Sequence, residues 1–205
     1  MPRKKKEIKV EPATPANSPF IKLDLGCGKN KIAPDWIGVD SINFPGVDVV
    51  TDLTQKWQWL DNSVDEVHCS HFIEHLNAQQ RIHFCNELYR VLKPGAKASV
   101  IAPHWSSCRA YGDMTHQWPP VSEFWFYYLD KNWRVGNAAA GVPANAPHDD
   151  IEFNPNGYNC DFAITWGYSL PPAISVRNQE YQNEAMNHWK DVCQDVISTW
   201  VKKRI

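Results

Sequence analysis

Short apolar runs, each ending at a glycine turn or near an acidic residue, most constrain how this 205-residue chain folds. The first run, residues 20–25, leads straight into Gly26-Cys27-Gly28. A run of this length bounded by glycine is typical of a buried strand. Comparable runs follow at residues 36–39, 47–50, 64–69 and 96–102.

One long amphipathic segment separates the last two of these runs. Residues 77–92 carry apolar side chains at helical spacing, Asn77 and Gln80 form a candidate capping box, and Pro94-Gly95 follows. Strand, helix and strand in this order build a parallel sheet. We therefore predict an α/β fold, a Rossmann-like and mainly parallel sheet with helices on both faces and an aromatic-rich lid inserted after strand five.

The lid is expected at residues 103–159, where periodicity is lost and large aromatic side chains crowd together. Within it we predict a short helix from Pro119 or Pro120 to Leu129, because proline favours a helix start.

After this segment the chain returns as a strand at residues 160–168. At about residues 177–203 we predict a terminal helix whose apolar face belongs to the core, with Trp200 a candidate dimer contact. Residues 1–19 are expected to be a disordered, basic and proline-rich leader, and residues 20–205 a single domain.

Composition excludes several classes of protein. The chain has no run of eighteen apolar residues and no apolar stretch behind its charged start, so we expect neither a membrane span nor a secretory signal. Its six cysteines form no C-x-x-C pair, which favours reduced thiols, no disulfides and a cytoplasmic location. The net charge of −2 argues against nucleic acid as the main partner. Nucleic acid remains a minority alternative, in which the basic residues of the leader would bind it.

Glycines and acids recur where the predicted strands end. The turn Gly26-Cys27-Gly28 lets a backbone approach a ligand closely, and an acid after the next strand, Asp40, can accept both hydroxyls of a ribose. Asp52 follows the third strand and residues 70–76 follow the fourth. In this order the motifs resemble the class I S-adenosylmethionine-dependent methyltransferases, and more narrowly the small type 11-like subset with an L-x-L-G-C-G opening, over about residues 20–129.

The resemblance implies S-adenosylmethionine as the cofactor and a set of residues that hold it. Asp24, Gly26, Cys27 and Gly28 would line its methionine part. Asp40 and Ser41 would hold the ribose, Asp52 and Leu53 would lie beside the adenine, and Ser70 and His71 would form the wall near the sulfonium. Two departures are Asn30, at the third glycine position of the motif, and residues 29–35, which are too few for the usual first helix.

Three histidines are candidates for the base that takes a proton from the acceptor: His116, His104 and His71. Residues 112–116, Gly-Asp-Met-Thr-His, resemble an Asp-Pro-Thr-His element found after strand five in many small methyltransferases. An alternative of equal weight is that His104 and His116 are structural and only form hydrogen bonds that hold the lid closed. Four side chains of the aromatic-rich segment are candidates for substrate binding: Trp105, Tyr111, Asp113 and Trp118.

Two patterns could indicate a metal, and we expect none. Residues 71–75, His-Phe-Ile-Glu-His, match an inverted zinc-protease signature, but that signature requires a long helix, and here it abuts a strand. His148-Asp149-Asp150 stands in a segment rich in proline, asparagine and glycine, where such residues are usually solvated.

The predicted function is methyl transfer to a hydroxyl or amine of a small molecule or glycan. Residues 69–72, Cys-Ser-His-Phe, replace the Asn/Asp-Pro-Pro-aromatic tetrad of amine-directed DNA methyltransferases, and no Pro-Cys nucleophile is present. A nucleic-acid methyltransferase, or a non-catalytic module that binds S-adenosylmethionine or nucleic acid, is the alternative. The oligomeric state is left open.

Overall fold

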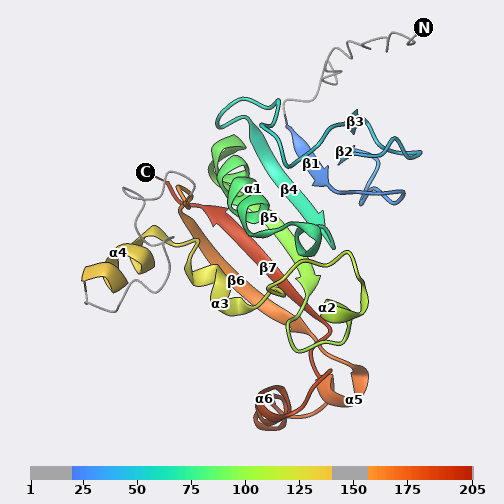
Figure 1. Ribbon diagram of the computed structural model, residues 1–205, viewed down its shortest axis with the longest axis vertical. Helices are drawn as coiled ribbons and strands as arrows, with labels where there is room; N and C mark the ends of the chain where they lie inside the picture. The colour runs from blue at the N-terminus through green and yellow to red at the C-terminus, as the bar shows by residue number, and fades with distance from the viewer. Residues whose placement is uncertain (1–19, 140–156, 205) are drawn as a thin grey trace, which may run out of the picture.

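The computed structural model describes residues 20–139 and 157–204. They form one seven-stranded sheet in the order β3-β2-β1-β4-β5-β7-β6 (Figure 1). The strands are β1 (Lys22–Leu25), β2 (Ile37–Asp40), β3 (Val49–Val50), β4 (Val64–Ser70), β5 (Leu92–Pro103), β6 (Phe162–Ser169) and β7 (Asp195–Lys202). Strands β1 to β5 pair in parallel, whereas β7 runs antiparallel to both β5 and β6. The predicted Rossmann-like, mainly parallel α/β fold is confirmed.

The longest helix is the predicted one, and it follows β4. The helical segments are the 3-10 turn η1 (Ile73–His75), α1 (Ala78–Val91), α2 (Arg109–Gly112), α3 (Glu123–Tyr127), α4 (Lys131–Ala139), α5 (Pro172–Ser175) and α6 (Gln179–His188). The side chains of Asn77 and Gln80 form the predicted capping box of α1. Between β1 and β2 the chain makes only turns, as the short spacing predicted. No helix in the described part of the chain is long and apolar enough to cross a membrane.

Side chains along β1 and β4 alternate between an apolar face and a polar face of the sheet. Leu23 lies opposite Val67 on the apolar face, and both are fully buried in the core beside Phe84 of α1. Asp24 lies opposite His68 on the other face. The period of two therefore separates the hydrophobic core from the polar side chains on the opposite face of the sheet.

The C-terminal part of the chain corrects the predicted helix at residues 177–203. Its first part is helix α6, but residues 195–202 form β7, with Val196, Ser198, Trp200 and Lys202 buried in alternation. β-branched residues fill the positions between them and favour a strand. The expected dimer contact at Trp200 is wrong as well, because this side chain is fully buried.

Part of the aromatic-rich segment belongs to the core. Helix α3 lies within the range predicted for a short helix, with Ser122 before its first residue. The rings of Trp125 and Phe126 pack against Trp200, at centroid distances of 5.7 and 6.0 Å. The far half of the predicted lid, residues 140–156, lies outside the described residues, and so does His148-Asp149-Asp150.

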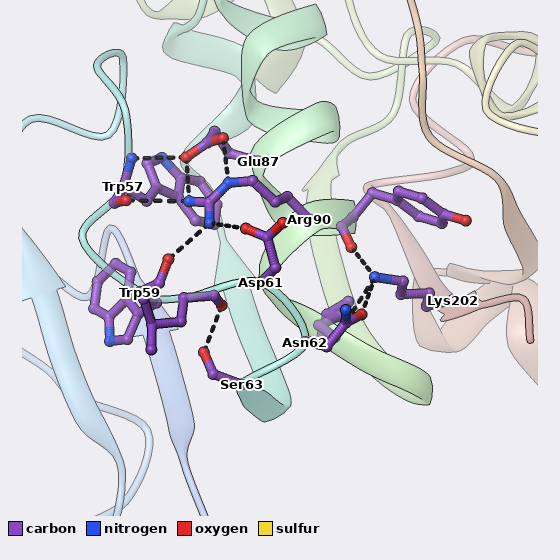
Figure 2. A network of polar contacts seen from close by, with 11 residues as sticks. Trp57, Trp59, Asp61, Asn62, Ser63, Glu87, Arg90 and Lys202 are labelled. Atoms are coloured by element: carbon purple, nitrogen blue, oxygen red, sulfur yellow. Dashed lines mark hydrogen bonds and ion pairs between the residues drawn. The ribbon is translucent and has the colours of Figure 1, made fainter.

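An arginine of α1 holds the loop between β3 and β4 (Figure 2). Arg90 Nε and Nη2 each donate to Glu87 at 2.7 Å, and Arg90 Nη1 donates to Trp59 O and Asp61 Oδ1 at 2.8 Å. Glu87 is buried and also accepts a hydrogen bond from Trp57 N at 2.7 Å. The ion pair of Arg90 and Glu87 therefore anchors the loop between β3 and β4.

We predict that Arg90→Met lowers the free energy of unfolding by about 2–4 kcal/mol, because it leaves the buried Glu87 carboxylate without its cationic partner. Urea unfolding followed by circular dichroism measures this loss. The matched control is Arg177→Met at an exposed position, which should change stability by less than about 0.5 kcal/mol. Equal stability of the two variants would contradict the anchoring role.

Candidate active site

The loop after β1 is held in a glycine-dependent conformation against the end of β2. Gly26 and Gly28 have φ angles of 69° and 54°, a region that favours glycine. Gly26 N donates to Val39 O at 2.8 Å, and Gly28 N donates to Asp40 Oδ2 at 2.9 Å. A Cβ at Gly26 would lie 2.6 Å from the ring of Phe72, whereas a Cβ at Gly28 would meet no atom within 4 Å. The backbone at Gly28 is therefore open to close approach by a ligand.

A first cavity of about 280 Å³ opens between this loop and the end of β4. Asp24 is almost fully buried there, and its Oδ2 accepts a hydrogen bond from Ile32 N at 2.7 Å. Burial raises the pKa of the Asp24 carboxyl, against the opposing effects of that hydrogen bond and of His68. Burial also raises the pKa of the Cys27 thiol to about 11, so this thiol stays neutral. The lining residues are Asp24, Gly26, Cys27, Asn30, Ile32, His68 and Ser70.

The remaining predicted cofactor residues lie outside that lining: Gly28, Asp40, Ser41, Asp52, Leu53 and His71. Asp40 uses Oδ2 for the glycine loop and Oδ1 for Ile42 N, and the neighbouring Ser41 is exposed. Asp52 is exposed, and hydrogen bonds from Thr54 lower the pKa of its carboxyl. The side chain of Leu53 is buried in the hydrophobic core.

A second cavity of about 730 Å³ is lined in part by residues that directly follow β4. Ser70 lines the first cavity and the next residue, His71, lines the second. The residues that line the second cavity are His71, Glu74, His75, Pro103, Arg109, Gly112, Asp113, Met114 and His116. Two predicted bases and one predicted substrate residue are thus brought together: His71, His116 and Asp113.

His71 lines the second cavity and directly follows Ser70, which lines the first. It has a φ of 54°, a value unusual for any residue other than glycine. Its Nδ1 lies 3.3 Å from Glu74 Oε1, and its Nε2 lies 3.9 Å from Asp195 Oδ1. The interaction with Glu74 raises the pKa of the imidazole, against the effects of burial and of Arg109. Arg109 in turn pairs with both oxygens of Asp195, at 3.0 and 3.1 Å.

The other candidate residues lie elsewhere. His104 is buried with both ring nitrogens occupied, Nδ1 at 2.8 Å from Ser106 Oγ and Nε2 at 3.1 Å from Glu123 Oε2. Trp105 and Tyr111 line a separate hollow of about 450 Å³. Trp118 is 78% exposed and lies in neither cavity lining.

Several residues of the two cavities were not predicted from sequence. His68 is an isolated histidine in a strand and carries no signal of its own, and Glu74 was recognised only within the pattern of residues 71–75, which we did not expect to bind a metal. No sequence pattern pointed to Arg109. Arg81 lines neither cavity but is buried against the loop that carries His116, and the sequence shows it only as a charged residue next to the apolar face of α1.

Residues 71–75 do not form the helical zinc site that their signature describes. The segment contains only the three-residue turn η1 after the left-handed residue His71, so its two histidines do not share the face of a long helix.

Comparison with known proteins connects this geometry to a family. Residues 23–100 match the model of a family described as a methyltransferase domain. Comparison with the curated proteins finds no match.

Solved structures show the same fold. A SAM-dependent methyltransferase from Archaeoglobus fulgidus is similar with a TM-score of 0.58 and 18% identity, over 89% of this chain and 86% of that chain. The YcgJ protein from Bacillus subtilis has a TM-score of 0.50 and 12% identity, over 91% of this chain and 93% of that one. Phosphoethanolamine N-methyltransferase 2 from Haemonchus contortus, solved with S-adenosyl-L-methionine, has a TM-score of 0.45 and 16% identity, over 93% of this chain and 50% of that one.

The likenesses to the Archaeoglobus fulgidus and Bacillus subtilis proteins show the fold. The chain thus has the fold of a SAM-dependent methyltransferase, and its residues 23–100 are similar to a methyltransferase domain.

Proposed function

We propose that the enzyme methylates a hydroxyl or amine of a small molecule or glycan that binds in the second cavity. The observation that carries this proposal is that Ser70 lines the first cavity and the next residue, His71, lines the second. Methyl transfer requires the nucleophile in line with the methyl carbon and in contact with it, with water excluded. The acceptor nucleophile would reach the methyl carbon beside these two consecutive residues.

The residues of the first cavity fit the cofactor. S-adenosylmethionine, when bound, supplies an electrophilic methyl group on a positively charged sulfonium. Asp24 Oδ1 has no hydrogen-bond partner within the described residues and belongs to the cavity lining, so it would accept from the amino group of the methionine part. The open backbone at Gly28 would line the methionine part and the acid Asp40 beside it would hold the ribose, as the family resemblance implies.

We assign the role of base to His71 and not to His104. Glu74 lies beside Nδ1 of His71, which leaves Nε2 toward the second cavity and Asp195. His104 uses both nitrogens within the fold, which supports a structural role for it. Asp113 remains a proposed acceptor contact because it lines the second cavity.

The domain organisation and location follow as part of the same proposal. Residues 20–205 would form one methyltransferase domain, with residues 103–159 as the acceptor-binding insertion. All six cysteines are free thiols, which supports a reducing compartment such as the cytoplasm.

Asp24→Asn tests the cofactor site. We expect the affinity for S-adenosylmethionine to fall about 10- to 100-fold in a calorimetric titration, because a charged hydrogen-bond partner is lost. The ligand-free variant should be at least as stable as the wild type at pH 8, since burial raises the folded-state pKa of Asp24 above its unfolded value and so penalises the charged form. That gain should shrink as pH falls toward the unfolded pKa.

The matched control for this test is Asp35→Asn, which neutralises an exposed acid that follows the same loop. It should leave cofactor affinity unchanged. Unchanged binding in Asp24→Asn would contradict the assignment of the first cavity.

His71→Asn tests the transfer step. Asparagine tolerates a positive φ but does not accept the proton, so we expect methyl transfer to fall about 10²- to 10⁴-fold while cofactor affinity is kept. The measurement is transfer of labelled methyl into pools of small metabolites, oligosaccharides and nucleic acids. His188→Asn, on the exposed surface of α6, is the control.

Labelling confined to nucleic acid would favour the alternative acceptor. Cofactor binding without transfer into any pool would favour a non-catalytic binding module. Full activity of His71→Asn would rule out His71 as the base.

A further inference from the structure

We propose that Glu74, His75 and His116 bind a divalent transition-metal ion of the Zn²⁺ type in the wall of the second cavity. One ligand atom from each of these three side chains lies within 4.8 Å of the other two. Ligand atoms of a tetrahedral zinc site are about 3.4 Å apart, a spacing that rotations of these side chains would reach. Two imidazoles and one carboxylate are a known donor set for zinc sites that keep an open fourth position.

Only one of the two oxygens of the Glu74 carboxylate has a partner among the described residues. Glu74 is 4% exposed, and its Oε1 lies beside His71 Nδ1. Its Oε2 is buried and has no hydrogen-bond partner. A buried carboxylate oxygen without a partner is costly, and a metal ion at this cavity wall would satisfy it.

Both imidazoles use Nδ1 within the fold, and Nε2 of His116 lies 3.9 Å from Asp113 Oδ2, beyond hydrogen-bond distance. The hydroxyl of Thr115 donates to Asp113 Oδ1 at 2.7 Å, because a carboxylate can only accept. The contact of 2.9 Å between Thr115 Oγ1 and His75 Nδ1 therefore requires a proton on Nδ1 of His75. His116 Nδ1 lies 3.3 Å from Ala110 O, which likewise assigns the proton to Nδ1. Metal-binding histidines almost always donate their second nitrogen to such a partner.

Arg81 holds the two segments that supply the ligands. This buried side chain donates to Ile73 O at 3.1 Å on the η1 side, and to Gln117 O at 3.1 Å on the side of His116. Gln117 N also donates to Glu74 O at 2.8 Å. The ligands are thus positioned by a fixed scaffold, as a metal site needs.

The ligand set differs from that of the zinc signature in residues 71–75. In that signature the two histidines bind zinc and the glutamate is the general base, so His75 alone is shared; here Glu74 and His116 are the other ligands, and His71 lies beside Glu74 Oε1 and Asp195 instead. If the proposed function holds, the open metal position would take an oxygen or nitrogen donor of the methyl acceptor and orient it in the second cavity. Metal binding itself does not depend on that function.

The experiment is a calorimetric titration of the chelator-treated, full-length protein with Zn²⁺ alone, without cofactor or acceptor. We expect one site with a micromolar or tighter dissociation constant, weakened at least 100-fold in His116→Ala. Thr115→Val keeps all three ligands but removes the partner of His75, and it should weaken binding about 10- to 100-fold. His188→Ala is the control and should bind as the wild type does.

Thermal unfolding with and without Zn²⁺ gives a second readout. The ion should raise the midpoint of the wild type and of His188→Ala but not that of His116→Ala. Should His116→Ala fail to fold, Thr115→Val carries the test, because Thr115 is exposed.

Absence of stoichiometric Zn²⁺ binding, or equal affinity in the wild type and Thr115→Val, would overturn the proposal. Because neither cofactor nor acceptor is present, such a failure leaves the methyl-transfer proposal standing. Conversely, Zn²⁺ binding by a protein that transfers no methyl group would separate the site from that function.

Discussion

The register between β1 and β4 is the constraint on which both cavities depend. It places Leu23 opposite Val67 in the core and Asp24 opposite His68 on the polar face. Because side chains alternate with a period of two, a slip by one residue would bring Asp24 into the core and expose Leu23. The same register ends β4 at Ser70, which lines the first cavity, so that His71, which lines the second, is the first residue after the strand.

Sequence reasoning predicted the parallel half of the fold because its signals are local. An apolar run, a glycine turn or a capping box is read within a few residues, and each of these was found where it was expected. The C-terminal strand was mistaken for a helix because Val196 and Trp200 are four positions apart, a spacing that shares one face in a helix and in a strand alike. The alternation of apolar and polar residues that indicates a strand is interrupted at two buried positions, which are polar: Ser198 and Lys202. Both hydrogen-bond to backbone carbonyls.

The two cavities also differed in how well the sequence could predict them. Much of the first cavity comes from the contiguous segment 24–32, so a motif could indicate it. The second combines η1, the end of β5 and the loop with His116, segments that meet only in the folded chain. Arg81 joins two of them through backbone carbonyls. Carbonyl groups are present at every residue, so no sequence pattern marks the partners of this arginine.

The position of β7 in the sheet has a consequence for how the molecule assembles. β5 and β6 do not pair with each other, because β7, the last of the seven strands along the chain, lies between them. Ser198 of β7 bonds to Val100 of β5 across 98 positions of sequence. Contacts between residues so distant form late in folding, because the entropy of loop closure must be overcome first. Until β7 docks, β5 and β6 each leave a strand edge unpaired, and such edges promote association between chains. The antiparallel part of this sheet is therefore where a newly made chain is most exposed to aggregation.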